Sequence, residues 1–274
     1  MGNLIMLLTS AAAEPDPSFF NTARINVLIA VLIYGALVLW FIYHARKGRE
    51  MFIRRIAGLD AVEEAVGRAT EMGKPILYVP GLADISVIST IASLNILAQV
   101  AKKTAQYNTT LLVPNRDPVV YTIAREVVKE SYTDAGRPDA FNQDNIYFIT
   151  QDQFGFTSAV CGTMVREKPA TNFFLGYFWA ESLVLAETGT TTGAIQIAGT
   201  DSIFQLPFFI VACDYTLIGE ELYAASAYLS REPLLLGSLK GQDWGKMIIT
   251  GILLLGSLLA LLGWSNVTRL FEIG

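Results

Sequence analysis

Two long runs of apolar residues, one near each end, dominate the hydropathy pattern of this chain. Ile25–Tyr43 holds about 19 residues and Met247–Trp264 about 18, and neither run contains a charged residue. A helix needs about 20 predominantly apolar residues to cross the hydrocarbon core of a bilayer. The pattern therefore predicts two transmembrane α-helices, at residues 25–44 and 246–264. The plainer alternative for each run is a helix buried in the core of a soluble domain.

Basic residues gather on one side of each run. They are Arg46, Lys47, Arg49, Arg54 and Arg55 after the first run, and Lys240 and Lys246 before the second. Because Lys and Arg are retained on the cytoplasmic side of a membrane, the region between the runs is expected in the cytoplasm. The predicted organisation is a cytoplasmic domain at residues 45–245, with extracytoplasmic segments at residues 1–24 and 265–274.

Between the two runs, short apolar segments alternate with longer helical patterns. The expected strands are Ile76–Val79, Leu111–Val113, Ile146–Ile149, Phe173–Tyr177 and Ala194–Ala198. The expected helices are Ile56–Met72, Ser86–Gln106, Pro118–Tyr132, Phe156–Arg166, Trp179–Glu187 and Leu206–Leu229. Continuous apolar strands separated by helices indicate a parallel sheet covered on both faces. The predicted fold is therefore α/β, with a doubly wound, mostly parallel, Rossmann-like sheet of about five strands.

The composition adds an expectation of self-association. Hydrophobic residues make up 52% of the chain and charged residues only 16%, against about 25% charged in an average soluble domain. The segments Ser86–Ala101 and Leu206–Gly219 are apolar on nearly every side, which is typical of helices in a large core, at a subunit interface or against lipid. A homo-oligomer is therefore expected. The net charge of −5 and the lack of a basic face argue against a nucleic-acid partner.

The residue inventory excludes several kinds of chemistry. His44 is the only histidine, which rules out a histidine-based zinc or iron site and a Ser-His-Asp or Cys-His nucleophile. Cys161 and Cys213 stand in apolar surroundings and are expected to be buried and reduced. Neither a G-x-G-x-x-G nor a G-x-x-x-x-G-K-[ST] loop follows a strand. No catalytic residue, metal or cofactor is predicted, and a non-enzymatic protein is favoured without excluding an enzyme.

Polar residues nevertheless follow the predicted strands, at the edge where open α/β sheets bind ligands. The candidate ligand-binding residues there are Asp84, Asn115, Arg116, Gln151, Thr200 and Asp201. Gly81, Asp117, Asp152 and Ser202 occupy the same strand ends. The plainer interpretation is that Asp and Ser before a helix simply cap it.

Three acidic residues in apolar stretches form a second group of candidates. Glu187 joins the ligand-binding candidates, because the Gly and Thr residues that follow it could form a turn around a ligand or a neighbouring subunit. Glu181 and Asp214 are predicted to be buried acids with a functional role. An unpartnered carboxylate is costly in an apolar environment. Each acid is therefore expected to have a partner, either a backbone amide or an arginine, or else a ligand or ion.

The second apolar run also contains two small residues four positions apart, Gly256 and Ala260. Small residues allow close approach of helices in lipid. The pair predicts a contact with the first run or with a neighbouring subunit, and the alternative is that this face meets lipid.

Several segments resemble a family of uncharacterised prokaryotic membrane proteins that is known only as a domain of unknown function. They are Gly58–Gly81, Ala180–Gly189, Gly193–Thr200, Cys213–Ser230 and Leu235–Asp243, and together they cover most of the predicted cytoplasmic domain. The resemblance implies one coherent domain at the plasma membrane of a prokaryote. It brings no activity and no catalytic residues.

The leading functional hypothesis is a membrane-anchored, homo-oligomeric scaffold or assembly protein, with the lipid bilayer and other membrane proteins as partners. The first alternative is a small-ligand sensor or enzyme that uses a pocket at the strand ends. The second is a transport or channel component, in which Leu206–Gly219 enters the membrane part-way and Asp214 acts as an intramembrane acid.

Overall fold

The computed structural model describes residues 25–48 and 57–262. The chain divides into two units, one formed by Met1–Arg49 with Gly237–Gly274, and the other by Glu50–Leu236. The predicted end segments 1–24 and 265–274, together with Arg49, Arg54 and Arg55, lie outside the described residues. Each unit is therefore treated by itself below.

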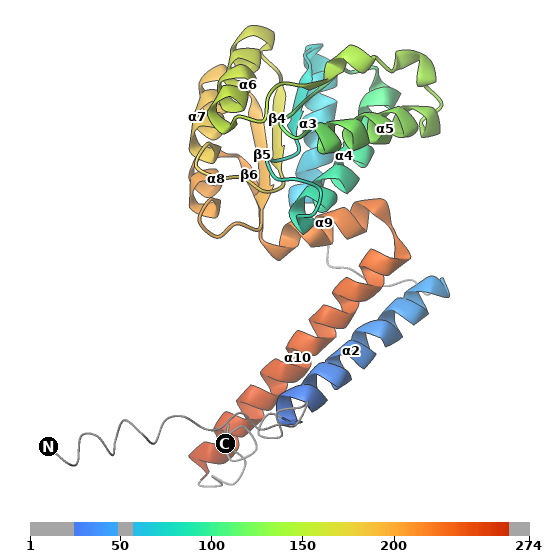
Figure 1. Ribbon diagram of the computed structural model, residues 1–274, viewed down its shortest axis with the longest axis vertical. Helices are drawn as coiled ribbons and strands as arrows, with labels where there is room; N and C mark the ends of the chain where they lie inside the picture. Colours follow the sequence, from blue (N-terminus) through green and yellow to red (C-terminus); the bar gives the residue numbers. More distant parts are fainter. Residues whose placement is uncertain (1–24, 49–56, 263–274) are drawn as a thin grey trace, which may run out of the picture. The chain divides into compact units, whose positions relative to one another are not determined.

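The larger unit is built on six parallel strands, which confirms the predicted α/β class (Figure 1). The strands are β1 (Ile76–Val79), β2 (Leu111–Asn115), β3 (Ile146–Phe148), β4 (Thr171–Leu175), β5 (Ile195–Thr200) and β6 (Tyr215–Ile218). Their order in the sheet is β3-β2-β1-β4-β5-β6. The chain therefore winds outward from β1 in one direction and from β4 in the other, which is the doubly wound topology.

Helices cover both faces of this sheet. They are α3 (Ala57–Met72), α4 (Ile88–Tyr107), α5 (Pro118–Asp134), α6 (Gln153–Glu167), α7 (Ser182–Thr192), α8 (Leu206–Ala212) and α9 (Glu220–Ser230). Residues of α3, α4, α5 and α9 form one buried apolar cluster with the sheet, and residues of α6, α7 and α8 form a second. Two short 3-10 turns, Pro138–Ala140 and Gln143–Asn145, precede β3.

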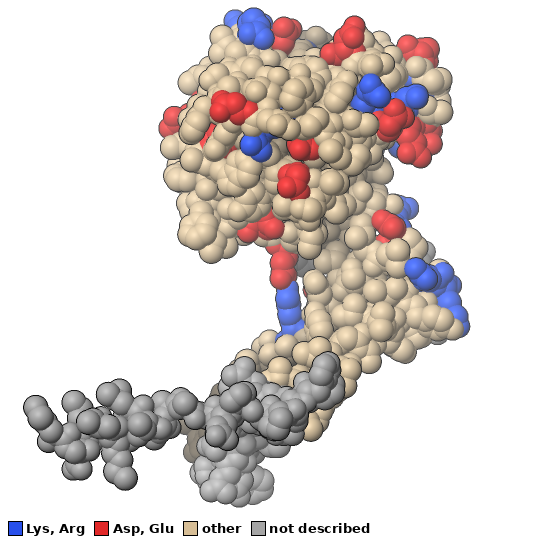
Figure 2. All heavy atoms as spheres, viewed as in Figure 1, with Lys and Arg blue, Asp and Glu red and all other residues tan. Residues whose placement is uncertain are grey.

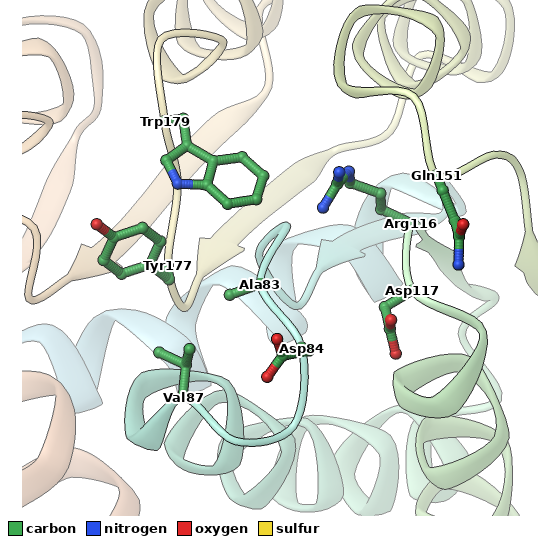
Figure 3. A pocket seen from close by; sticks show the side chains of 8 residues that line it. All are labelled: Ala83, Asp84, Val87, Arg116, Asp117, Gln151, Tyr177 and Trp179. Carbon is green, nitrogen blue, oxygen red and sulfur yellow. The ribbon is translucent and has the colours of Figure 1, made fainter.

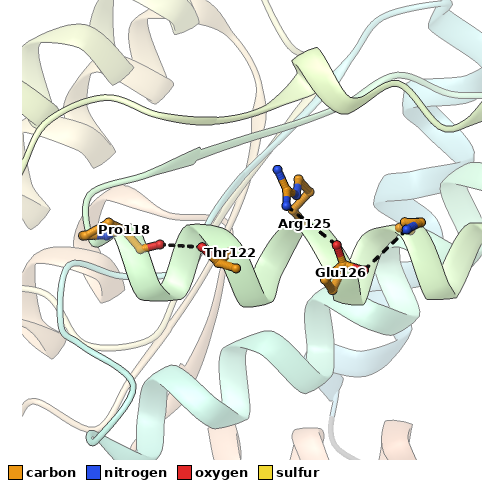
Figure 4. A network of polar contacts seen from close by, with 5 residues as sticks. Pro118, Thr122, Arg125 and Glu126 are labelled. Atoms are coloured by element: carbon orange, nitrogen blue, oxygen red, sulfur yellow. Dashed lines mark hydrogen bonds and ion pairs between the residues drawn. The ribbon is translucent and has the colours of Figure 1, made fainter.

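The helix starts show why these segments fold locally. Asp117 accepts hydrogen bonds from the amides of Val119 and Val120 at the start of α5, and Asp152 accepts one from Gly155 at the start of α6. Both aspartates therefore act as N-caps. Further along α5, Glu126 pairs with its neighbour Arg125 and with a lysine one turn later (Figure 4). Such solvent-facing pairs contribute little to stability.

The prediction of one long helix over Leu206–Leu229 is wrong. This segment contains α8, the edge strand β6 and α9. The break comes at Asp214, whose carboxylate accepts a hydrogen bond from the amide of Gln196 at 2.8 Å. Strand β6 ends at Ile218, and Gly219 with φ +57° separates it from α9. A four-residue strand inside a long apolar stretch carries too few positions to show its own period. The sheet therefore has six strands rather than about five.

The stretch after β4 also differs from expectation. Helix α7 covers Ser182–Thr192 instead of Trp179–Glu187, so Thr190–Thr192 are its last turn and not a ligand-binding turn. Gly193 ends the helix with φ +73°. A glycine tolerates this left-handed conformation without strain, which is why the helix stops there.

The helix α4 accounts for much of the apolar excess seen in the sequence. It packs against α3, α5, α9 and the sheet, and eleven of its residues are buried. Tyr78 from β1 donates a hydrogen bond from its hydroxyl to the carbonyl of Ser93 at 2.6 Å. Burial raises the pKa of this tyrosine. The surface of α4 is thus largely used inside the domain and does not need a second subunit to cover it.

The smaller unit is an antiparallel pair formed by α2 (Ile25–Arg46) and most of α10 (Pro233–Leu261). Both helices are long and apolar enough to cross a membrane, and few of their side chains are buried within the protein. Helix α10 begins at Pro233, earlier than the predicted start at residue 246. Among the described residues, Gly256 has no neighbour within 4 Å of the position where a Cβ would lie, so the predicted Gly256 contact does not form within the chain.

Candidate functional site

A pocket of about 490 Å³ lies at the carboxyl ends of the central strands. Its lining residues follow β1, β2, β3 and β4: Ala83, Asp84, Val87, Arg116, Asp117, Gln151, Tyr177 and Trp179 (Figure 3). Since β1 and β4 are neighbours whose following helices cover opposite faces, the pocket occupies the topological switch point of the sheet. This is the place where doubly wound sheets bind ligands.

Two glycines let the loops after β1 and β4 touch at the base of the pocket. Gly81 has φ +87°, and a Cβ there would lie 2.7 Å from the amide nitrogen of Tyr177. Gly176 has φ +128°, and its Cβ would lie 2.6 Å from the carbonyl oxygen of Pro80. The amide of Leu82 donates to the carbonyl of Tyr177 at 2.8 Å. Only glycine combines these backbone angles with so little space.

Among the residues that the structure describes, Arg116 is the one cation that lines the pocket. Its Nη1 donates a hydrogen bond to the carbonyl of Leu82 at 2.7 Å, and its guanidinium lies 4.8 Å from the ring centroid of Trp179. This cation–π arrangement fixes the plane of the guanidinium. The Nε of Arg116 is buried and has no hydrogen-bond partner among the described residues. A buried donor without a partner is costly in free energy.

Two carboxylates, those of Asp84 and Asp117, also line the pocket and come from the loops after β1 and β2 (Figure 3). Asp84 accepts hydrogen bonds from the amide of Ser86 at 2.8 Å and from its hydroxyl at 2.5 Å. These bonds lower the pKa of Asp84, which is exposed and therefore stays ionised. Asp117 uses one oxygen to cap α5. One guanidinium and two carboxylates give the pocket a formal charge of −1.

Glu181 is fully buried, as predicted, and holds the loop that carries Trp179. Its carboxylate accepts a hydrogen bond from the amide of Trp179 at 2.7 Å and another from the side-chain amide of Gln153 at the start of α6. The partners are thus amide groups of the protein. Glu181 positions the loop, while Trp179 faces the pocket.

The structure brings together only some of the predicted site residues. Asp84, Arg116 and Gln151 line the pocket. Asn115 is fully buried and donates to the carbonyl of Val113 at 2.8 Å, so it supports the strand end without lining the pocket. Asp201 does not line it either.

Beyond the pocket, the residues after β5 form their own arrangement. Thr200 is buried, and the hydroxyl of Tyr223 in α9 donates to Asp201 at 2.5 Å. Burial and the adjacent carboxylate raise the pKa of Tyr223.

With this geometry described, the chain can be placed among known proteins. A family profile described as "Domain of unknown function (DUF6754)" matches residues 15–271. The chain belongs to this family. No curated protein matches the chain. No solved structure matches it either.

Two acids of this DUF6754 chain, the ligand-binding candidate Glu187 and the predicted buried acid Asp214, are exposed. Glu187 lies on α7 and faces outward, because the helix turns this position away from the sheet. Asp214 is exposed at the start of the edge strand β6, and its partner is the backbone amide of Gln196. The prediction of burial is therefore wrong for Asp214, because its apolar neighbours in the sequence point in other directions. Glu187 does not line the pocket.

The aromatic side chains of the pocket were not predicted. Tyr177 and Trp179 were read as a strand end and a helix start, whereas both lie in the loop after β4. The signal that could have identified them is the aromatic cluster that follows Gly176 at a strand end. An aromatic side chain in that place is as apolar as a core residue, so hydropathy alone does not separate the two roles.

The thiols lie less deep than predicted. Cys161 and Cys213 are unpaired and only half-buried. Burial raises the pKa of both thiols, and Asp214 adds to the effect on Cys213, whose pKa rises to about 12. Within residues 25–48 and 57–262, no group of three or more His, Cys, Asp and Glu side chains could hold a metal ion.

Proposed function

We propose that this protein is a membrane-anchored ligand-binding protein, in which the pocket at the switch point takes up a small molecule from the cytoplasm. The observation that carries the proposal is the open pocket of about 490 Å³ between the β1 and β4 loops. Its volume lies within the ~300–1,000 Å³ of typical small-molecule sites. A sheet edge packed shut by side chains would have left no room for a ligand.

The proposed location is the plasma membrane of a prokaryote, with α2 and α10 as anchors, the α/β domain in the cytoplasm and both chain ends outside. The length and apolarity of the two helices support anchoring. Arg46 and Lys47 at the end of α2 support the orientation.

The lining of the pocket favours a planar ligand that carries little negative charge. Tyr177 and Trp179 offer flat aromatic surfaces, and Asp84 and Asp117 each have a carboxylate oxygen to accept hydrogen bonds from a ligand. The formal charge of −1 disfavours a triphosphate, because like charges repel. We therefore propose a nucleoside or a compound of similar shape, whose ring stacks on an aromatic side chain and whose hydroxyls donate to the carboxylates.

The lining residues also favour binding over turnover. None of the eight is a serine, cysteine, lysine or histidine, so the pocket does not present the usual activated nucleophile. The low pKa of Asp84 removes it as a proton donor near neutral pH. A sensing role follows more directly than an enzymatic one.

Calorimetric titration of the full-length protein in mild detergent with adenosine tests the proposal. We expect saturable binding that Arg116→Gln weakens about 10-fold, since hydrogen bonds to charged groups contribute roughly 1.5–3 kcal/mol. Arg125→Gln, on the outward face of α5, is the matched control and should leave binding unchanged. Tighter binding of adenosine triphosphate would contradict the ligand class, and no heat with either compound would contradict the pocket's role.

A second candidate function is the homo-oligomeric scaffold, favoured by an apolar patch around α8. The patch comprises Ile203, Phe204, Phe208, Ile210 and Val211, all exposed. Apolar patches on a surface often mark protein contacts. Light scattering in detergent should show an oligomer that Phe204→Ser and Val211→Ser weaken; a monomeric wild-type protein would argue against this role.

The same region argues against an anionic partner. Residues 169–230 contain no Lys or Arg but six acids, Glu181, Glu187, Asp201, Asp214, Glu220 and Glu221. On the face of the larger unit shown in Figure 2, Lys and Arg are scattered among Asp and Glu and form no basic surface. A nucleic-acid partner therefore finds no support there. The channel alternative loses its motivation as well, because β6 is part of the sheet.

A further inference from the structure

The contact between α2 and α10 fixes their register along the helix axis. Three glycines of α10, each one turn after the last, lie against the backbone or ring of three α2 residues: Gly237 on Ile42, Gly241 on Val38 and Gly245 on Tyr34. A Cβ on these glycines would approach those residues to between 2.5 and 2.9 Å. The three glycines are also the buried residues of α10. Close packing at small residues is a main source of helix association in lipid.

This register places the two apolar runs at different heights. Tyr34, at the centre of the first run, lies level with Gly245, whereas the centre of the second run lies near Leu255. The offset is about 10 residues, or ~15 Å at 1.5 Å per residue. That is about half of the ~30 Å hydrocarbon core.

No position of the bilayer accommodates both runs of a single hairpin. Centring it on α2 brings Asp243 and Lys246, which are exposed, into the hydrocarbon at the height of Ala36 and Ile33 along the axis. Centring it on the second run leaves the exposed Leu39 and Trp40 in water. A halfway position leaves ~7 Å of the offset at each end. A charged residue within the hydrocarbon costs roughly 2.5–3.5 kcal/mol on the scale derived from insertion.

The polar residues of α10 share one stripe. From Asp243 to the end of the described helix, the polar residues are Asp243, Lys246, Thr250 and Ser257. Their spacing of three, four and seven places them on one side, and at 100° per residue this side lies opposite the glycine contact. The stripe therefore faces away from α2, and Asp243, Lys246, Thr250 and Ser257 are all exposed.

We propose that this stripe is an interface within the membrane and that its occupant is the same stripe of a second copy of the chain. The stripe carries both signs of charge, so two parallel copies are complementary. Asp243 of one copy and Lys246 of the other lie about one turn apart, ~4.5 Å along the axis, which a lysine side chain spans. Thr250 can hydrogen-bond across the same contact, and Ser257, whose hydroxyl donates to the carbonyl of Leu253 at 2.8 Å, can accept there. The inference rests on the membrane anchoring proposed above and deepens the expectation of a homo-oligomer.

Disulfide cross-linking in native membranes tests the contact. In a Cys161→Ser, Cys213→Ser background, Thr250→Cys should form a covalent dimer under mild oxidation. Leu39→Cys, at an exposed position of α2, is the matched control and should remain monomeric. Equal cross-linking at both positions would show random collision and overturn the proposal, as would no cross-linking at Thr250→Cys.

Charge exchange distinguishes a contact between copies from one within the helix. Asp243→Lys and Lys246→Asp should each reduce the dimer several-fold in native-mass or cross-linking measurements, and co-expression of the two variants should restore it as a mixed dimer. Recovery only when both changes stand in one chain would assign the pair to a single helix and overturn the interface. The melting temperature of the α/β domain should stay unchanged in both variants, which excludes misfolding.

Extraction with alkaline carbonate separates failure of this proposal from failure of the anchoring. Protein that is washed from membranes contradicts both. Protein that stays in the membrane fraction but forms no Thr250→Cys dimer contradicts only the proposed contact between two copies of the chain.

Discussion

Helices α4 and α8 come from the two segments between the long apolar runs that stand out as apolar in the sequence, and they differ in their surroundings. α4 is enclosed by α3, α5, α9 and the sheet, and residues such as Leu97 and Val100 are fully buried. α8 is a short helix beside the edge strand β6, and Val211 is 87% exposed. Hydropathy shows that a segment is unfavourable in water. The position of the segment relative to the sheet decides which elements cover it. The apolar excess that suggests an oligomer is therefore located at α8 and not at α4.

The largest expected effect comes from truncating the covered helix. Leu97→Ala in α4 should lower the free energy of unfolding by about 2–5 kcal/mol, because it leaves a cavity in the core. Val211→Ala in α8 should change it by less than ~0.5 kcal/mol, because the side chain meets solvent. Chemical denaturation of the two full-length variants in detergent provides the comparison. A similar loss for both would show that α8 is covered in the protein as isolated.

A smaller loss of stability is expected where a helix packs so close to the sheet that no space remains for a side chain. Gly189 in α7 faces Gln196, and a Cβ would lie 2.0 Å from its Oε1. Gly189→Ala should therefore destabilise the domain by about 1–3 kcal/mol. Gly67→Ala in α3 is the control, since no atom lies within 4 Å, and higher helix propensity should stabilise it by ~0.5–1 kcal/mol. Thermal unfolding that moves both variants in the same direction would contradict this packing.

The sequence predicts a region well where the pattern is local, and poorly where the structure depends on contacts between distant segments. The first five strands and the caps Asp117 and Asp152 were predictable, because buried parallel strands and N-caps have local signatures. β6 was missed because four residues of an edge strand leave no distinct period within an apolar stretch. Strand-end position correctly brought Asp84, Arg116 and Gln151 to one pocket. It could not show that Asp201 pairs with Tyr223, because that contact depends on how α9 folds back.

The hairpin shows the same limit at the level of helix pairs. The sequence suggested Gly256 as a contact, whereas the structure uses Gly237, Gly241 and Gly245, which lie before the apolar run. The motif of small residues four apart occurs in both places. The register of α2 against α10 decides which of the two motifs forms the contact. Register depends on both helices together, so the sequence of α10 alone does not reveal it.

The smallest expected effect concerns acid and the exposed loop after β1. The bonds from Ser86 lower the pKa of Asp84 in the folded protein. A carboxyl group with a depressed folded pKa stabilises the fold above its unfolded pKa of about 3.9, and this contribution is lost as the pH falls through the folded value. Asp84→Asn should therefore reduce the acid-side slope of stability, with little change at pH 7 beyond the loss of the charged hydrogen bond.

Unfolding curves of the full-length protein between pH 3 and pH 7 measure this slope. Asp144→Asn, at an exposed carboxylate in the turn before β3, is the matched control. The Asp84 variant should differ from wild type mainly below pH 5, and the control should follow wild type throughout. A steeper acid-side loss in Asp84→Asn would mean that the carboxylate is destabilised in the fold by Asp117, which lines the same pocket. The two acids would then act as a repelling pair, and a ligand that donates hydrogen bonds to both would stabilise the domain most at neutral pH.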